Sequence, residues 1–206
     1  MNWFKRIATA VGAFALVATM SDEKAEARVI ISEKTVYYEI SGNTGAKLFR
    51  SINKRGPRVR RVGHAIATTT ASLQVRNVRT AVNKRRCRIA NVDVVLDLTY
   101  RYPRWRGSRN ASPEVRRNWE RFLKRVVRHE ERHGAISKKF ARTIHDEIKG
   151  SKGRVSRKCK DFGKRAKQKL NRAAARHERA HRRFDQRENR SSARIRRLQA
   201  ALIVSE

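Results

Sequence analysis

Residues 112–150 read SPEVRRNWERFLKRVVRHEERHGAISKKFARTIHDEIKG, and this stretch predicts one long amphipathic helix. Ser112 is a suitable N-cap, Pro113 fits the first helical position, and Glu114 places an acid in the first turn. Apolar and aromatic residues then return every three or four positions, as they do on one face of a helix. They are Val115, Trp119, Phe122, Val126, Ile136, Phe140, Ile144 and Ile148. His129 and His133 fall on the same stripe, so both imidazoles are expected to point inward.

A second helical pattern follows Gly150 and Gly153, which end the first. Its inward stripe is Phe162, Ala166, Leu170, Ala173, His177, His181 and Phe184. The remaining positions of this segment are mostly Lys and Arg, which is typical of a solvated helix face. The sequence therefore predicts two long helices, each with a pair of histidines four residues apart on its apolar side.

The chain before Pro103 has the period of β-strands. Residues 87–102 alternate strictly between an apolar face and a largely polar face. The apolar face is Ala90, Val92, Val94, Leu96, Leu98, Tyr100 and Tyr102. Residues 33–40 and 64–75 are further strand candidates, and residues 46–53 suggest a short helix between them. Because strands with one wet face favour antiparallel pairing, the predicted fold class is α+β: a small antiparallel β-sheet in the N-terminal half, then two long helices.

The first 27 residues have the features of an export signal. Lys5 and Arg6 precede a mostly apolar run at residues 7–20, and Ala25 and Ala27 are small residues suited to cleavage. The run is shorter than the roughly 20 residues of a membrane helix, and no later segment is apolar enough to span. We therefore expect a signal peptide at 1–27, one domain at 28–190 and a basic C-terminal tail at 191–206. The alternative for 1–27 is an uncleaved amphipathic anchor. After signal removal the chain is expected to be secreted or periplasmic.

The chain contains two cysteines, Cys87 and Cys159. In an oxidising compartment two cysteines are compatible with one disulfide bond, which would close a long loop. The alternative is a pair of free thiols, with Cys159 as a metal ligand. Neither cysteine belongs to a CxxC motif, so the disulfide is the preferred interpretation.

The formal net charge is +34, and it is concentrated late in the chain, where residues 150–197 hold 19 Lys and Arg against four Asp and Glu. Such a chain is expected to have a non-specific affinity for anionic polymers or a membrane surface. The charge indicates partners and carries no information about catalysis.

Two copies of His-Glu-x-x-His stand at residues 129–133 and 177–181. Positions i and i+4 share one face of a helix, so each pair can offer two nitrogens to one divalent metal ion. Zn²⁺ is the cofactor that imidazole ligands in a hydrolase favour. His129 and His133 are then predicted ligands, and Glu130 is the predicted general base for a water molecule. The alternative is that these histidines are hydrogen-bonded core residues.

A catalytic zinc ion needs a third protein ligand, and position 139, six residues after His133, is a lysine. The second histidine helix is the expected donor, with His181 as the first choice. His177, Asp185 and Glu188 are alternatives, Asp185 also as a residue that orients a ligand. Four arginines near this pair argue against a cation there. Paired Glu-x-x-His units also occur in two-metal carboxylate bundles, but the further glutamates that such a site requires are missing apart from Glu120.

These residues resemble the bacterial family of predicted secreted zinc-dependent proteases of otherwise unknown function. The similarity extends from about residue 36 to residue 188. It rests on Tyr37–Gly42, Thr68–Thr70, Cys87 with the strand into Trp105, Trp119 and Phe122, the motif at 129–133, Cys159, Phe184 and Asp185. The resemblance implies a metallopeptidase-like domain with His129 and His133 as ligands and Glu130 as catalytic base. Family members also carry a Thr and a His-Gly after the aromatic-Asp pair, where this chain has Glu188, Arg190 and Ser191, so the third ligand stays open.

The sequence thus predicts an exported zinc-dependent hydrolase that acts on a peptide or protein substrate. The alternative is a non-catalytic, strongly basic envelope protein that binds anionic polymer and has a structural metal site. A closed site of His129, His133, His177 and His181 would favour the alternative, and three ligands with an open position would favour the hydrolase.

Overall fold

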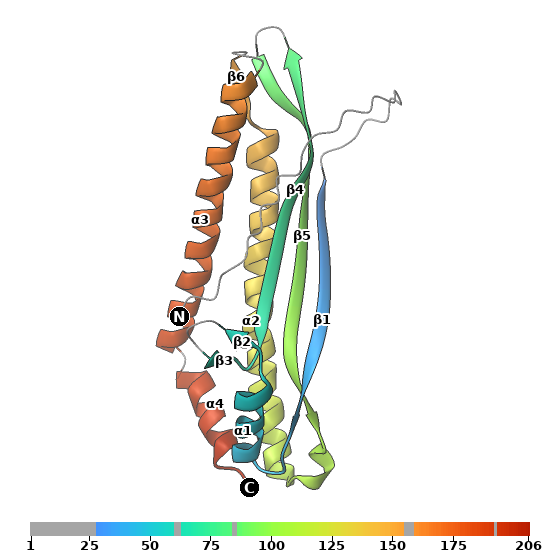
Figure 1. Ribbon diagram of the computed structural model, residues 1–206. Coiled ribbons are helices and arrows are strands. Elements are labelled where there is room, and N and C mark those ends of the chain that lie inside the picture. The colour runs from blue at the N-terminus through green and yellow to red at the C-terminus, as the bar shows by residue number, and fades with distance from the viewer. Residues whose placement is uncertain (1–27, 60–62, 84–85, 155–158, 192) are drawn as a thin grey trace.

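The computed structural model describes residues 28–59, 63–83, 86–154, 159–191 and 193–206 (Figure 1). The expected signal peptide lies outside these residues. In chain order the elements are β1 (Val29–Ser41), α1 (Gly45–Arg55), β2 (Arg58–Val59), β3 (Gly63–His64), β4 (Thr68–Asn83), β5 (Arg86–Arg106), the 3-10 turn η1 (Ser108–Asn110), α2 (Pro113–Lys149), β6 (Lys152–Arg154), α3 (Lys160–Ser191) and α4 (Ala193–Ile203). Every element that the sequence predicts is present. The strand predicted at 64–75 begins later, at Thr68, and ends later, whereas the other two strands and the second long helix extend further than predicted at both ends.

The main sheet has the order β1-β5-β4, and β6 pairs with the first residues of β5. β5 is the central strand, and its alternating residues Val92, Val94, Leu96 and Leu98 are buried on the side of the helices. β4 and β5 form an antiparallel pair of consecutive strands. β1 pairs with the other edge of β5, from Val29 opposite Val94 to Ser41 opposite Arg106.

The α+β class is confirmed, but the expectation of an antiparallel sheet is wrong for one pair, because β1 runs parallel to β5. The alternating pattern shows that one face of a strand is covered, and it does not report the direction of the neighbouring strand. A parallel pair usually has helices on both faces. Here the long helices cover one face only, so a parallel pair keeps the alternation of an antiparallel one (Figure 1).

The long helix α2 lies between the sheet and α3, so the molecule has three layers and an elongated shape (Figure 1). The Ser112 hydroxyl caps α2 by accepting a hydrogen bond from the Val115 N–H, Pro113 occupies the first turn, and Gly150 ends the helix. One side of α2 faces the sheet, where Trp119 packs against Trp105 of β5. Its other side faces α3, where Phe140 stacks on His177. The stripe of the predicted helix therefore serves two interfaces.

Gly134 lets α2 approach β5 closely. A Cβ atom at this position would lie 1.9 Å from the Tyr100 hydroxyl oxygen, so either Tyr100 or the helix would have to shift. Gly134 directly follows His133, so this contact sets the distance between the motif helix and the sheet. On the same side of the sheet Lys138 of α2 forms an ion pair of 2.7 Å with Glu33 of β1.

A disulfide bond joins Cys87 at the start of β5 to Cys159 just before α3. The predicted disulfide is confirmed, and the alternative of free thiols is wrong. The bond ties the beginning of α3 to the sheet at the end of the molecule where β6 also pairs with β5.

Most of the expected C-terminal tail forms α4, which contacts α1 and α2. Leu202 is fully buried, and the Gly45 N–H donates a hydrogen bond of 3.1 Å to the Ser205 carbonyl oxygen. Ser112, the cap of α2, hydrogen-bonds to the Glu206 carbonyl. The division of the chain into a domain at 28–190 and a basic tail at 191–206 stays a prediction. Among the described helices, none combines the length and apolar character needed to cross a membrane.

Candidate metal centre

The two histidine motifs lie opposite one another, on α2 and α3. His133 of α2 contacts His181 of α3, and further along α2 Phe140 contacts His177. Higher numbers on one helix therefore meet lower numbers on the other, so the helices are antiparallel. Phe184 of α3 packs against the first histidine pair. The centre of its ring lies 4.9 Å from that of His129 and 5.0 Å from that of His133.

Three side chains direct one ligand atom each to a common point: His129, His133 and Asp185. The His129 and His133 Nε2 atoms are 3.2 Å apart. Asp185 Oδ1 lies 3.0 Å from His133 Nε2 and 3.7 Å from His129 Nε2. The two predicted ligands are thus brought together, and the third member comes from α3, as expected.

The shape of this triangle fits a bound metal ion. Ligand atoms at about 2.0–2.1 Å from a tetrahedral zinc ion lie about 3.3 Å from one another. The three observed separations of 3.0, 3.2 and 3.7 Å bracket this value. The side chains of His129 and Asp185 are 24% and 19% exposed, whereas that of His133 is 5% exposed. The triangle is therefore partly exposed to solvent on the side of His129 and Asp185.

His181, the first choice for the third ligand, lies behind His133 instead of beside it. Its Nδ1 atom is 2.7 Å from His133 Nδ1, the nitrogen that points away from the triangle. His177 is further along, with its Nε2 atom 2.7 Å from His181 Nε2. Glu188 is on the other flank, where a carboxylate oxygen is 3.6 Å from His129 Nδ1. The structure thus brings all four candidates near the motif, and it is Asp185 that completes the triangle.

Burial keeps most of these imidazoles uncharged. It lowers the pKa of His129, and the neighbouring His133 lowers it further, while Asp185 and Glu188 act in the opposite direction. Burial, with smaller effects of neighbouring histidines, lowers the pKa of His177 to about 4 and that of His181 to about 2. These three imidazoles are neutral at pH 7. Neutral imidazole is the form that binds metal ions.

Glu130 is directed toward the sheet and is 4% exposed. The Thr69 hydroxyl of β4 lies 2.7 Å from Glu130 Oε2 and 3.0 Å from the Glu130 carbonyl oxygen, and can donate to either. Burial raises the pKa of Glu130, whereas the hydrogen bond from Thr69 and the charge of His133 lower it. The charge of Asp185 also raises it. Sequence reasoning missed Thr69: its threonine-rich strand was recognised, but nothing in it marks the hydroxyl that faces α2.

The arginines of α3 do not enter the site. Arg176, Arg179, Arg182 and Arg183 are all exposed on the outer side of α3. Arg176 pairs with Glu147, and Arg182 pairs with Glu178. This arrangement removes the electrostatic objection to a cation. It also occupies Glu178, so the described residues do not assemble a two-metal carboxylate site.

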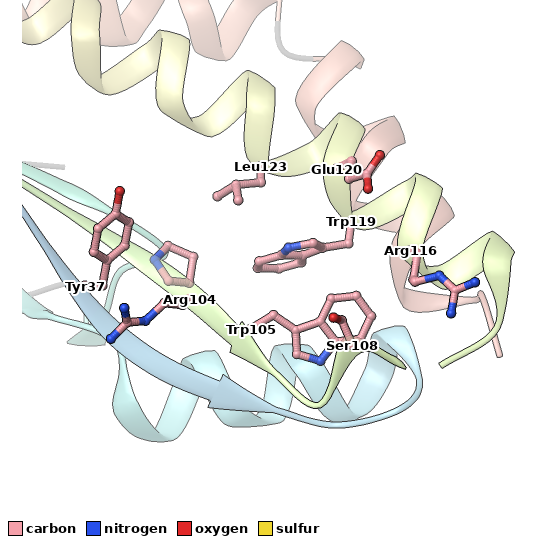
Figure 2. A pocket seen from close by; sticks show the side chains of 9 residues that line it. Tyr37, Arg104, Trp105, Ser108, Arg116, Trp119, Glu120 and Leu123 are labelled. Atoms are coloured by element: carbon pink, nitrogen blue, oxygen red, sulfur yellow. The ribbon is translucent and has the colours of Figure 1, made fainter. Parts of the chain in front are cut away.

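A groove of about 350 Å³ lies at the end of the molecule where α2 begins (Figure 2). It is lined by Tyr37, Pro103, Arg104, Trp105, Ser108, Arg116, Trp119, Glu120 and Leu123. In Figure 2 Trp105 of β5 and Trp119 of α2 lie together, and Arg104 lies near Tyr37, with its guanidinium carbon 5.5 Å from the centre of that ring. Leu123 is seven residues, or about two turns and 10 Å, before Glu130 on the same side of α2. The groove thus lies along the same side of α2 as the carboxyl.

The chain matches a protein-family model that is described as bacterial protein of unknown function (DUF922) and that aligns with residues 35–192. The matched span contains the whole triangle, Glu130, Thr69 and both cysteines. Neither the curated proteins nor the solved structures contain a match.

Proposed function

Since the chain belongs to the bacterial family of unknown function DUF922, we propose from its site that it is an exported zinc-dependent hydrolase that cleaves peptide bonds. The observation that carries the proposal is the triangle of His129, His133 and Asp185. Two imidazoles and one carboxylate with an open fourth position are the ligand set of a catalytic zinc ion. The disulfide supports the extracytoplasmic location.

Two histidines and a carboxylate also hold Fe²⁺ in oxygenases, so the ligands alone do not define the chemistry. Glu130 favours hydrolysis. It follows the first ligand directly in the sequence, and its charge interacts with His133 and Asp185. A carboxyl whose pKa is raised toward the working pH is a better proton acceptor for water than an exposed one.

A zinc ion at the triangle would acidify a water molecule and polarise the carbonyl group of the substrate. Glu130 would accept a proton from that water molecule while the water oxygen attacks the carbonyl carbon of the substrate. When the C–N bond breaks, Glu130 would return the proton to the amine nitrogen that leaves. Thr69 would hold the Glu130 carboxylate in place during both transfers. Leu123, the lining residue of the groove nearest to Glu130 along α2, is about 10 Å from it, a distance that about three residues of extended peptide can span.

The test uses the purified mature protein and one matched pair of variants. We expect one zinc ion per chain by elemental analysis, and hydrolysis of a broad peptide library that a chelator abolishes. Glu130→Gln should keep the zinc and lower hydrolysis by at least about a hundredfold, the lower end of the contribution of a general base. Glu131→Gln is the control, because Glu131 is the exposed neighbour on the same helix. Iron in place of zinc, or equal activity of wild type and Glu130→Gln, would contradict the proposal.

A second candidate function, a non-catalytic protein that binds an anionic surface, is favoured by the outer side of α3. The exposed basic side chains on this helix are Lys164, Arg165, Lys167, Lys169, Arg172, Arg176, Arg179, Arg182, Arg183 and Arg187. If this is the function, a zinc-loaded wild type will be inert on peptides, and Glu130→Gln will change nothing. Binding to anionic vesicles that weakens with salt is expected in either case, since charge alone produces it.

A further inference from the structure

We infer that His181 is a positioning residue of the metal centre: it accepts the Nδ1–H of His133, so that His133 presents Nε2 to the ion. The inference deepens the proposed function and rests on its metal site. It assigns a role to the second His-Glu-x-x-His copy, which supplies no member of the triangle.

The two nitrogens of His133 have different neighbours. Nε2 lies 3.2 Å from His129 Nε2 and 3.0 Å from Asp185 Oδ1, so it points into the triangle. Nδ1 lies 2.7 Å from His181 Nδ1. A neutral imidazole has one N–H, and a nitrogen that binds a metal ion has none. With an ion on Nε2, the proton of His133 is therefore on Nδ1, and His181 Nδ1 is its acceptor.

His181 is in turn oriented by its own neighbours. If His181 accepts at Nδ1, its own proton is on Nε2, which lies 2.7 Å from His177 Nε2 and 3.4 Å from Ser137 Oγ. Both nitrogens of His181 are thus used, although its side chain is fully buried. Ser137 is one turn after His133 on α2 and lies 3.2 Å from His177 Nε2. The four side chains form one hydrogen-bonded chain that fixes the orientation of the His133 ring.

Residues on one face of α3 contact both ligand histidines. His181, Asp185 and Glu188 are four and three residues apart, so they share a face of α3. Asp185 enters the triangle, and the other two lie one turn to either side of it. Glu188, which pairs with Arg125, approaches His129 at Nδ1, as His181 approaches His133 at Nδ1.

An imidazole suits this position better than a carboxylate does. With a zinc ion bound, Asp185 and Glu130 already balance its two positive charges. A further carboxylate at residue 181, which is fully buried, would leave an uncompensated charge, and that is costly. Neutral His181 accepts the hydrogen bond without adding charge.

Two variants of nearly equal shape test the inference. The substitution His181→Asn keeps a hydrogen-bond acceptor at the place of Nδ1, and His181→Leu removes it. We expect His181→Leu to weaken zinc binding by about 10- to 100-fold, the usual cost of losing such a partner, and His181→Asn to restore most of the affinity. Competition with a chromophoric chelator measures both. The visible spectrum of bound Co²⁺ should keep the band pattern of the wild type in both variants, because no ligand is lost. Gln186→Leu, at an exposed position of α3, is the control.

A direct measurement on the zinc-loaded wild type does not depend on how the variants fold. The ¹⁵N spectrum of the imidazoles should show His133 protonated at Nδ1 and unprotonated at Nε2. The inference is overturned if this proton is on Nε2, if both variants bind zinc as the wild type does, or if Leu and Asn are equally harmful and the Co²⁺ spectrum loses a nitrogen ligand. A wild type that binds no zinc would overturn the proposed function itself, and the inference with it.

Discussion

At the scale of single residues, the environment of Glu130 decides whether it can act as a base. Burial raises its pKa, and the hydrogen bond from Thr69 is the largest influence that lowers it. The hydrogen bond favours the ionised carboxylate, which accepts a proton, over the neutral acid, which does not. The two opposing effects should set the acid limb of the pH profile.

We predict that Thr69→Val moves the acid limb of the kcat/KM profile to higher pH. Valine keeps the shape of threonine but cannot donate, so the pKa of Glu130 rises further and less of it is ionised at a given acidic pH. A hydrogen bond to a charged group is worth about 1.5 kcal/mol or more, so activity on the acid limb should fall about tenfold and recover at alkaline pH. Thr70→Val is the control, because Thr70 is exposed on the same strand. A uniform loss at all pH values would show that Thr69 acts only through packing.

The approach of His129 to His133 was predictable because both lie within five residues of one helix. Helical geometry fixes their mutual positions whatever surrounds them. The third member of the triangle was not. His181 and Asp185 are four residues apart on the same face of α3, which is about 6 Å along the helix axis. Which of them meets the triangle depends on how far α3 is shifted along α2, and no local pattern contains that shift.

At the scale of elements, the contact between α2 and β5 determines how closely the motif at residues 129–133 approaches the sheet. Gly134 and Tyr100 meet where Glu130 reaches Thr69, so a change in this contact should displace the carboxyl. The Tyr100 hydroxyl also lies 3.2 Å from Glu33 of β1. The contact therefore connects α2 to two strands.

We predict that Gly134→Ala destabilises the protein, although alanine is favoured over glycine by about 1 kcal/mol inside a helix. The added Cβ would lie 1.9 Å from the Tyr100 hydroxyl and 2.8 Å from Tyr100 Cζ. Overpacking of this kind costs about 1–3 kcal/mol, which urea denaturation can measure. Tyr100→Phe removes the nearer atom and should restore part of the loss in the double variant. A Gly134→Ala variant that is more stable than the wild type would contradict a close approach of α2 to β5 at this position.

The strands show which features of the architecture can be predicted from a local sequence pattern. The alternation of residues 87–102 predicted the covered face of β5, from Val92 to Tyr102, because burial acts on each side chain where it stands. The direction of β1 depends on how the chain travels between residues 42 and 85 before β5 inserts beside it. That path is a property of the whole chain, so the parallel pair could not be predicted.

At the scale of the whole molecule, α3 is the outermost layer, and it supplies one member of the triangle (Figure 1). Two of its attachments to the rest of the fold differ in kind. The disulfide ties Cys159, just before its first turn, to the sheet. The buried contacts of Phe162, Ala173, His177, His181 and Phe184 hold its inner side.

These two attachments should contribute differently to stability and to metal binding. Cys159 is 26 residues before Asp185, or about 39 Å along a helix, so the disulfide is remote from the triangle. The axial position of α3 at the triangle should be set locally, by the histidines and Phe184 that interlock with α2. The disulfide acts mainly on the unfolded chain, in which it closes a loop between two residues that are 72 positions apart.

We therefore predict that the Cys87→Ser/Cys159→Ser double variant loses about 4 kcal/mol of unfolding free energy and still binds one zinc ion per chain with nearly the affinity of the wild type. Urea denaturation measures the first quantity, and chelator competition without denaturant measures the second. Replacing both cysteines avoids a free thiol that would itself bind zinc. A folded double variant with much weaker zinc binding would show that the covalent bond at the far end of the molecule holds α3 in register with α2. In that case reduction of the disulfide would release the metal ion.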